Sequence, residues 1–170
     1  MKLTYIYKLC IIPPKHLKNK NLMHRIFRNP KVYVFASLIV YVISLTQPAI
    51  SSTELEDKTL SGIATLVMGG LSILGGGIFE WIIWLANPLY FLSVILFFNK
   101  KGQAKVLSLV STTVALSFIA WKKILVSESG RLGEIDSLDL GYWLWTLSLM
   151  TLTIGMFLSK NNLESNKHYA

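Results

Sequence analysis

The chain has 170 residues, of which 52% are hydrophobic and only 15% charged, and its mean hydropathy is +0.49. A water-soluble domain of this length could not bury so much apolar surface, which excludes a soluble globular fold. The net charge of +8 is unevenly placed, because residues 1–53 hold eight lysines and arginines and no acid. Composition therefore predicts an integral membrane protein with a basic N-terminal tail.

The basic tail, residues 1–31, has two interpretations. Lysine and arginine can neutralise nucleic-acid phosphates, but no nucleic-acid-binding motif accompanies them here. The tail directly precedes an apolar run, where cations favour the cytosolic side and contact anionic lipid. We therefore expect a cytosolic tail and no nucleic-acid partner.

Met23 offers a second start, in which case residues 1–22 are an upstream extension.

Two long apolar regions follow the tail. Residues 32–49 are interpreted as an uncleaved signal anchor, because the preceding segment is too long for a signal peptide. Residues 61–98 are apolar throughout, and one straight helix of that length would measure about 57 Å, nearly twice the hydrocarbon thickness. We expect a break at the three glycines 75–77, at Glu80, or at Asn87 and Pro88.

Two further apolar runs, 104–121 and 140–158, have spanning length, and hydrophilic joints separate all these regions. If residues 61–98 cross once, thirteen of the seventeen lysines and arginines are cytosolic, whereas two crossings leave eleven. The positive-inside rule favours the first arrangement. It places both termini, including the tail 159–170, on the cytoplasmic side of the membrane.

The expected fold is an all-α polytopic membrane protein that forms one membrane domain over residues 32–158. Its spans are 32–49, 80–98, 104–121 and 140–158, and residues 61–77 form an interfacial or re-entrant segment. The alternative has five spans, with residues 61–98 as a hairpin. In either arrangement the five tryptophans lie at one boundary of the bilayer, as an aromatic belt.

Residues 80–88 contain the candidate polar face in the membrane. Glu80 is the single acid inside an apolar region, and on a helix it shares a face with Trp84 and Asn87. Pro88 would kink this span, and Asn87 could bond a carbonyl that the proline frees. An ion or proton pathway is one interpretation; a hydrated carboxylate at the water boundary is the one we favour.

Residues 61–77 carry small side chains at helical spacing, which we interpret as a helix-packing stripe. The stripe consists of Gly62, Thr65, Gly69, Ser72 and Gly76. Lining a pore is the alternative function. Serines and threonines of the last two spans are expected to bond backbone carbonyls or neighbouring helices.

Catalytic, cofactor and metal sites are not predicted. All three histidines lie in the tails, and Cys10 is the single cysteine, so neither an intramembrane metal site nor a disulfide is expected. No serine has a histidine partner within the apolar runs, and no phosphate-binding loop is present. These patterns do not predict an enzyme.

Two segments carry a resemblance. The segment 76–88, with its glycine pair and Trp-Leu-Ala-Asn-Pro element, and the Gly-Tyr-Trp-Leu-Trp start of the last span resemble a group of small uncharacterised bacterial inner-membrane proteins. That resemblance covers about residues 60–158. It implies a bacterial membrane setting and no known activity.

Three functions are compatible with the sequence. The leading hypothesis is a non-enzymatic accessory or structural component, whose partners are the lipid bilayer and either a second copy or another membrane protein. The second is a small oligomeric transporter or channel that uses Glu80 and Asn87. The third is a toxin-immunity or lysis-type membrane protein, which rests on small size alone.

Overall fold

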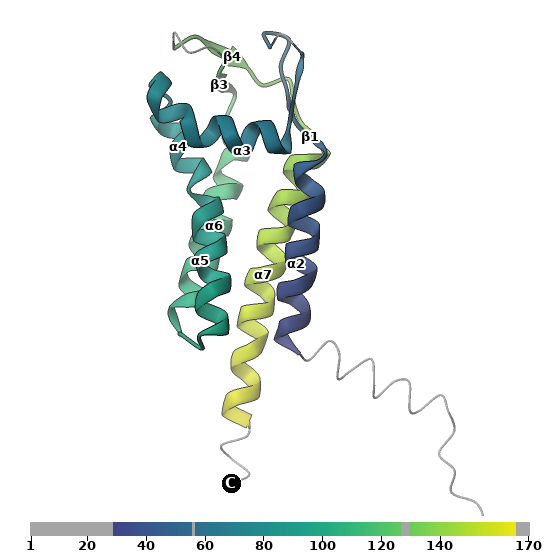
Figure 1. The fold of residues 1–170 in the computed structure, drawn as a ribbon, viewed down its shortest axis with the longest axis vertical. Coiled ribbons are helices and arrows are strands. Elements are labelled where there is room, and N and C mark those ends of the chain that lie inside the picture. The colour runs from purple at the N-terminus through teal and green to yellow at the C-terminus, as the bar shows by residue number, and fades with distance from the viewer. Residues whose placement is uncertain (1–28, 56, 127–129, 166–170) are drawn as a thin grey trace, which may run out of the picture.

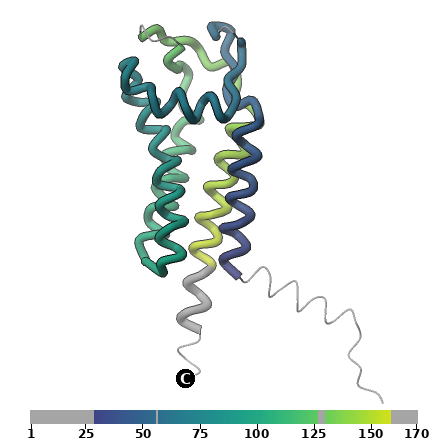
Figure 2. Tube along the Cα trace, viewed as in Figure 1, coloured from purple at the N-terminus to yellow at the C-terminus, as the bar shows by residue number. Residues whose placement is uncertain are grey.

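The computed structural model describes residues 29–55, 57–126 and 130–165, with side chains described as far as residue 158. Most of the basic tail, the second start at Met23 and the last five residues lie outside these ranges. The described chain is mostly helical, and its long helices run side by side (Figures 1 and 2).

Helix α2 (Pro30–Leu45) begins and ends at clear sequence signals. The Asn29 side chain accepts from the backbone N–H of Lys31 (3.1 Å), and Pro30 occupies the first turn. The helix stops before Pro48, so its 16 residues cover about 24 Å. The predicted span 32–49 is therefore helical only as far as Leu45, because Pro48 cannot supply an N–H and opens a strand.

The long apolar region 61–98 is broken, as its length requires. Helix α3 (Gly62–Leu71) and the 3₁₀ turn η1 (Ser72–Gly75) lie across the ends of the other helices (Figure 1). Gly76 then adopts a left-handed φ of 85°, which favours glycine, and reverses the chain. Helices α4 (Ile78–Trp84) and α5 (Ala86–Phe98) return along the bundle.

The remaining helices complete a four-helix arrangement. Helix α6 (Gln103–Ser117) continues into the 3₁₀ turn η2 (Phe118–Ala120), and α7 (Leu140–Ser165) packs closely along α2. Three helical stretches in the described chain are long and apolar enough to cross a membrane: Ile78–Phe98, Gln103–Ala120 and Leu140–Leu158. Helix α2 is apolar but shorter.

The joints contain short strands, which the all-α prediction missed. Strands β1 (Pro48–Ser51), β2 (Thr59–Ser61) and β5 (Ser137–Leu138) form an antiparallel sheet in the order β2-β1-β5. Strands β3 (Lys123–Leu125) and β4 (Leu132–Glu134) pair as a hairpin. The strands lie at the same end of the bundle as α3, which we name the sheet end (Figure 1).

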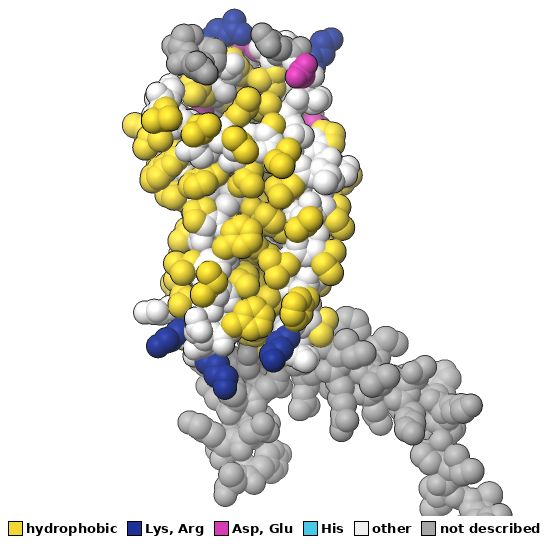
Figure 3. Space-filling view, viewed as in Figure 1, with side chains coloured by type: hydrophobic (Ala, Val, Ile, Leu, Met, Phe, Trp, Pro, Cys, Tyr) yellow, Lys and Arg dark blue, Asp and Glu magenta, His cyan; other side chains and the backbone are white. Residues whose placement is uncertain are grey.

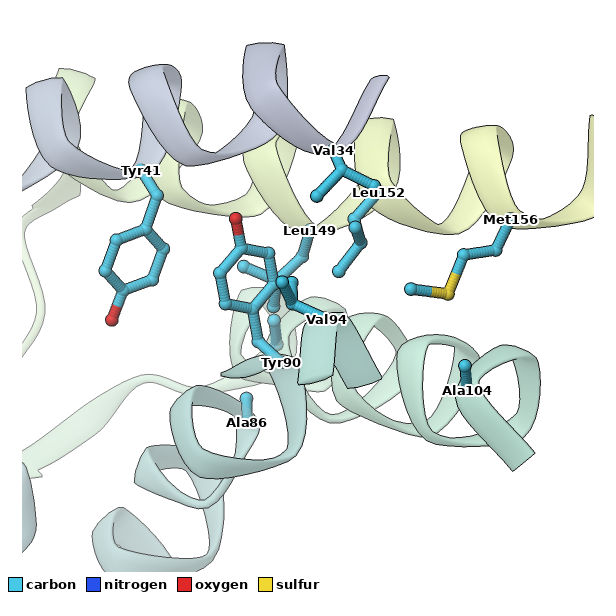
Figure 4. Packing of buried hydrophobic residues seen from close by; sticks show 10 residues of the cluster. Val34, Tyr41, Ala86, Tyr90, Val94, Ala104, Leu149, Leu152 and Met156 are labelled. Carbon is cyan, nitrogen blue, oxygen red and sulfur yellow. The ribbon is translucent and has the colours of Figure 1, made fainter. Parts of the chain in front are cut away.

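The bundle interior combines apolar packing with buried hydroxyl groups. Figure 4 shows the apolar cluster, in which side chains from α2 and α7 face those from α5 and α6. The Ser37 hydroxyl bonds to both the Tyr90 hydroxyl (2.7 Å) and the carbonyl of Ser148 (2.7 Å). The Ser111 hydroxyl donates to the carbonyl of Ala86 (2.7 Å), which links α6 to α5. The expected bonding of hydroxyls from the last two spans to neighbouring helices is confirmed at Ser111, whereas Ser37 lies in the first apolar run, for which no such role was predicted.

The surface divides into an apolar middle and two charged ends (Figure 3). Side chains such as Phe35, Ile39 and Ile154 are more than half exposed along the helices. Lysines gather at the end opposite the strands, which we name the lysine end: Lys31, Lys100, Lys101 and Lys105. The sheet end carries both acids and bases.

Candidate functional site

Helix α3 is held at its N-terminal end by close backbone contact with α2. The N–H of Gly62 donates to the carbonyl of Gln47 (2.8 Å). A Cβ on Gly62 would collide with the carbonyl oxygen of Ser44, so glycine is needed for this approach. The Ser61 hydroxyl accepts from the N–H of Ala64 (3.3 Å) and caps the helix. The start of α3 is therefore fixed in position and direction.

The C-terminal half of α3 is held by the indole of Trp84. The indole N–H donates to the carbonyl of Leu66 (2.8 Å). The ring lies against Gly69 and Gly70, where an added Cβ would come within 3.1 Å of ring atoms. Two adjacent glycines thus provide a flat surface on which the indole packs and bonds.

A cavity of about 880 Å³ lies between α3 and the ends of the bundle helices. Its lining also includes residues from the end of α2, from β1, β2 and β3, from η1 and η2, from α4 and α5, and from the first turns of α7. Most of the lining side chains are apolar, among them Leu66, Ile83, Phe118, Ile124 and Val126. The site is thus a mainly apolar chamber with few polar groups.

Glu80 supplies the charge in this chamber. It is half-buried in the first turn of α4, and its Oε1 accepts from the backbone N–H of Leu125 in β3 (3.0 Å). Among the described residues that line the cavity, no other side chain is charged. A carboxylate can accept up to about four hydrogen bonds, so Glu80 retains accepting capacity beyond this contact.

Asn87 occupies the inner side of the cavity and is 7% exposed. Its Oδ1 accepts from the Tyr41 hydroxyl (2.8 Å) and from the Trp145 indole N–H (2.9 Å). Its Nδ2 donates to the carbonyl of Trp84 (2.9 Å), which Pro88 leaves without a backbone donor. The expected bond from Asn87 to a freed carbonyl is therefore present, and the amide joins α2, α5 and α7.

The bundle interior beyond Asn87 is filled by side chains. The rings of Tyr41 and Tyr90 stack with centroids 5.0 Å apart, and both residues are buried. Leu149, Leu152 and Met156 continue the packing toward the lysine end (Figure 4). The cavity therefore ends at the Asn87 network and does not continue along the bundle axis.

The residues of the predicted polar face separate into two groups. Glu80, Trp84 and Asn87 all line the cavity, whereas Pro88 is exposed on the outside of α5. Glu80 and Asn87 are two helical turns apart, about 10 Å, so the carboxylate and the amide lie at different depths. Three of the four residues thus line one cavity, and the Asn87 amide makes three hydrogen bonds within the protein.

The predicted small-residue stripe also divides. Four of its members line the cavity: Gly62, Thr65, Gly69 and Ser72. The Ser72 hydroxyl bonds to the carbonyls of Gly69 (2.7 Å) and Gly77 (3.0 Å), which stabilises the end of the segment. Gly76 lies in the left-handed turn and has open space around its Cα, so its role is conformational.

Sequence reasoning missed three residues that complete the site. Tyr41 and Trp145 supply the donors to Asn87, and Gly70 forms half of the surface under Trp84. A tyrosine hydroxyl in the middle of an apolar run was a usable signal, because a buried phenol needs a partner. Trp145 was assigned to the aromatic belt, but its indole points inward to the amide.

The acids of the last joint have structural partners. Asp136 Oδ2 accepts from the N–H of Thr53 (2.6 Å), and the Asp139 carboxylate bonds to the hydroxyls of Ser51 and Ser137. Within the described ranges, no group of three potential metal ligands occurs. These carboxylates therefore connect the β1–β2 segment to the start of α7.

Apolar helices of spanning length, an apolar lateral surface and charged ends together suggest an integral membrane protein of the helical class. No protein-family model, curated protein or solved structure matches the chain at a significant level. Its function must therefore be argued from its own geometry.

Proposed function

We propose that the protein is a non-enzymatic accessory or structural component of a bacterial inner membrane, with four spans and both termini in the cytoplasm. In this topology α2, α4–α5, α6 and α7 cross the bilayer, and α3 with η1 lies in the outer interface. The orientation of α3 across the helix ends supports an interfacial position (Figure 1).

Contacts between the joints support four spans over five. Strand β1 pairs with β5 through Ile50 and Leu138, and Thr53 bonds to Asp136. Segments that share backbone hydrogen bonds lie on one side of a membrane, so the chain between them crosses an even number of times. Four spans place two crossings there, whereas five spans would require three.

The distribution of charge supports the orientation. Four lysines mark the lysine end. Among the residues at that end whose side chains are described, none is Asp or Glu, whereas the sheet end carries residues of both charges. Positively charged residues favour the cytoplasmic side, so the lysine end is placed there. At 16 residues α2 is short for a span, and Lys31 at its start can extend toward the headgroups.

The exposed apolar surface of α3 and η1 is the observation that carries an accessory role. Ile63, Leu71 and Leu74 are each more than half exposed; Leu71 and Leu74 also border the cavity, whereas Ile63 lies outside its lining. An apolar surface of this kind at a membrane boundary can contact lipid or the helix of a partner. We expect that partner to be a second copy or another membrane protein.

Photo-crosslinking in native membranes tests this role. A photoreactive residue at Ile63, on α3, is compared with one at Ile154, an equally apolar and exposed position on α7. A discrete protein adduct at position 63, absent at 154, is the expected result. Recovery of uncrosslinked monomer alone at both positions would contradict an accessory role through α3.

A further inference from the structure

The cavity beneath α3 is large enough to hold a small molecule. Its volume of about 880 Å³ lies within the range of roughly 300–1,000 Å³ that is typical of ligand pockets. The two ends of α3 are held by Gly62 and Trp84, so the space between them is maintained by fixed contacts. An unoccupied apolar space of this size would forfeit many dispersion contacts.

The lining determines what an occupant must look like. Because most lining side chains are apolar, the occupant must be apolar over most of its surface. Polar atoms at the inner side have partners within the protein, since Asn87 Oδ1 accepts two bonds, Asn87 Nδ2 donates to the carbonyl of Trp84, and the Trp84 indole N–H donates to the carbonyl of Leu66. The inner part of the chamber therefore suits hydrocarbon.

The outer part of the chamber has a different requirement. Glu80 is a half-buried carboxylate among apolar neighbours, and the backbone N–H of Leu125 is its hydrogen-bond donor within the described part of the chain. A carboxylate in such surroundings is stabilised by a cation that also donates hydrogen bonds. An ammonium group meets both conditions.

We propose that this cavity binds an amphipathic molecule with an apolar body and a primary ammonium group, the ammonium placed against Glu80 and the body directed toward Trp145. Two sources share this chemistry: an aminophospholipid such as phosphatidylethanolamine, and a free long-chain amine. The proposal requires only the folded protein, so its failure would leave the accessory role standing.

Tryptophan fluorescence provides the measurement, because Trp84 and Trp145 both line the cavity. The full chain is reconstituted in phosphatidylcholine nanodiscs and titrated at pH 7 with brominated dodecylamine or, separately, brominated dodecanoate. Bromine quenches an indole only at short range. We expect the amine to quench saturably at a concentration about tenfold lower than the carboxylate does. Only the amine can form a charge-assisted hydrogen bond with Glu80, and such a bond accounts for a difference of this size.

Three variants separate binding at the site from partition into the bilayer. Glu80→Gln keeps an acceptor for Leu125 but removes the charge, and should abolish the preference for the amine. Glu134→Gln removes a charge of the same sign from an exposed strand outside the lining, and should leave the preference intact. Thr65→Phe fills the cavity from α3, and should eliminate saturable quenching by either probe.

Competition identifies the source of the ligand. If phosphatidylethanolamine in the nanodisc displaces the amine probe, the site takes a lipid; if it does not while the probe still saturates, the site takes a free amine. Quenching that rises without saturation, or that is unchanged in Glu80→Gln, would overturn the proposal.

Discussion

At the scale of single residues, Asn87 shows how a proline in a span can be accommodated. Pro88 removes the backbone donor that the carbonyl of Trp84 would otherwise receive, and the neighbouring amide replaces it at 2.9 Å. The same amide then has its oxygen free for two donors from other helices, Tyr41 and Trp145. One side chain thus replaces the missing backbone donor and joins three helices.

Asn87→Leu should reduce stability by about 1–3 kcal/mol, because it leaves two buried donors and one carbonyl without partners. Reversible unfolding in mixed micelles measures the effect. Thr113→Val is the matched control, since this exposed threonine bonds within its own helix, to the carbonyl of Leu109, and its loss should change stability by less than about 0.5 kcal/mol. Equal stability of Asn87→Leu and the parent would contradict a structural role for the amide.

The residue-level prediction from sequence succeeded where the chemistry was local. Asn87 next to Pro88 predicted a bond to a freed carbonyl, because donor and acceptor lie within one helical turn. Its partners Tyr41 and Trp145 lie 46 and 58 residues away, and no periodicity reports such a distance. Glu80 was assigned to a hydrated boundary, whereas its bond to Leu125 depends on a strand that the sequence did not reveal.

At the scale of elements, α3 depends on glycines that act in different ways. Gly62 permits close backbone contact with α2. Gly69 and Gly70 leave room for the Trp84 ring to pack against the helix, and Gly76 adopts the left-handed conformation of a turn. Spacing alone predicted a small-residue helix face but could not assign these separate roles. The short strands were missed because each has at most four residues, too few for an alternating pattern.

Gly62→Ala tests the contact between α3 and α2. The added methyl group would collide with the carbonyl of Ser44, so we expect destabilisation of about 1–3 kcal/mol, the range typical of overpacking. Gly102→Ala is the control, because a methyl group there would meet nothing within 4 Å and the φ of −61° suits alanine. That variant should be neutral or slightly stabilising. If both substitutions have the same effect, α3 is not held by this contact.

At the scale of the whole molecule, a charge comparison from the sequence and contacts from the structure favour the same four-span topology. The charge comparison favoured four spans on a margin of two cations, thirteen against eleven. Cross-strand bonds between the first and last joints supply an independent argument, because they place both joints on the same side. This argument could not be made from the sequence, because nothing in the sequence indicates that residues 51 and 137, far apart along the chain, are paired in the sheet.

Cysteine labelling tests the topology directly. In a Cys10→Ser background, single cysteines are placed at Asp57, Lys101 and Glu134, all exposed in the structure. Glu134 is preferable to its neighbour Gly133, where a side chain would collide with Val126. With four spans, a membrane-impermeant maleimide added outside intact cells should label positions 57 and 134 but label position 101 only after the membrane is opened.

The five-span alternative makes a different forecast for the same three positions. It places residue 101 outside and residue 134 inside, so the labels at these two positions would exchange. That result would also separate β1 from β5 by a bilayer, which their pairing at Ile50 and Leu138 does not permit. External labelling at 101 would therefore remove the four-span topology and the sheet end together, because the two depend on the same backbone hydrogen bonds.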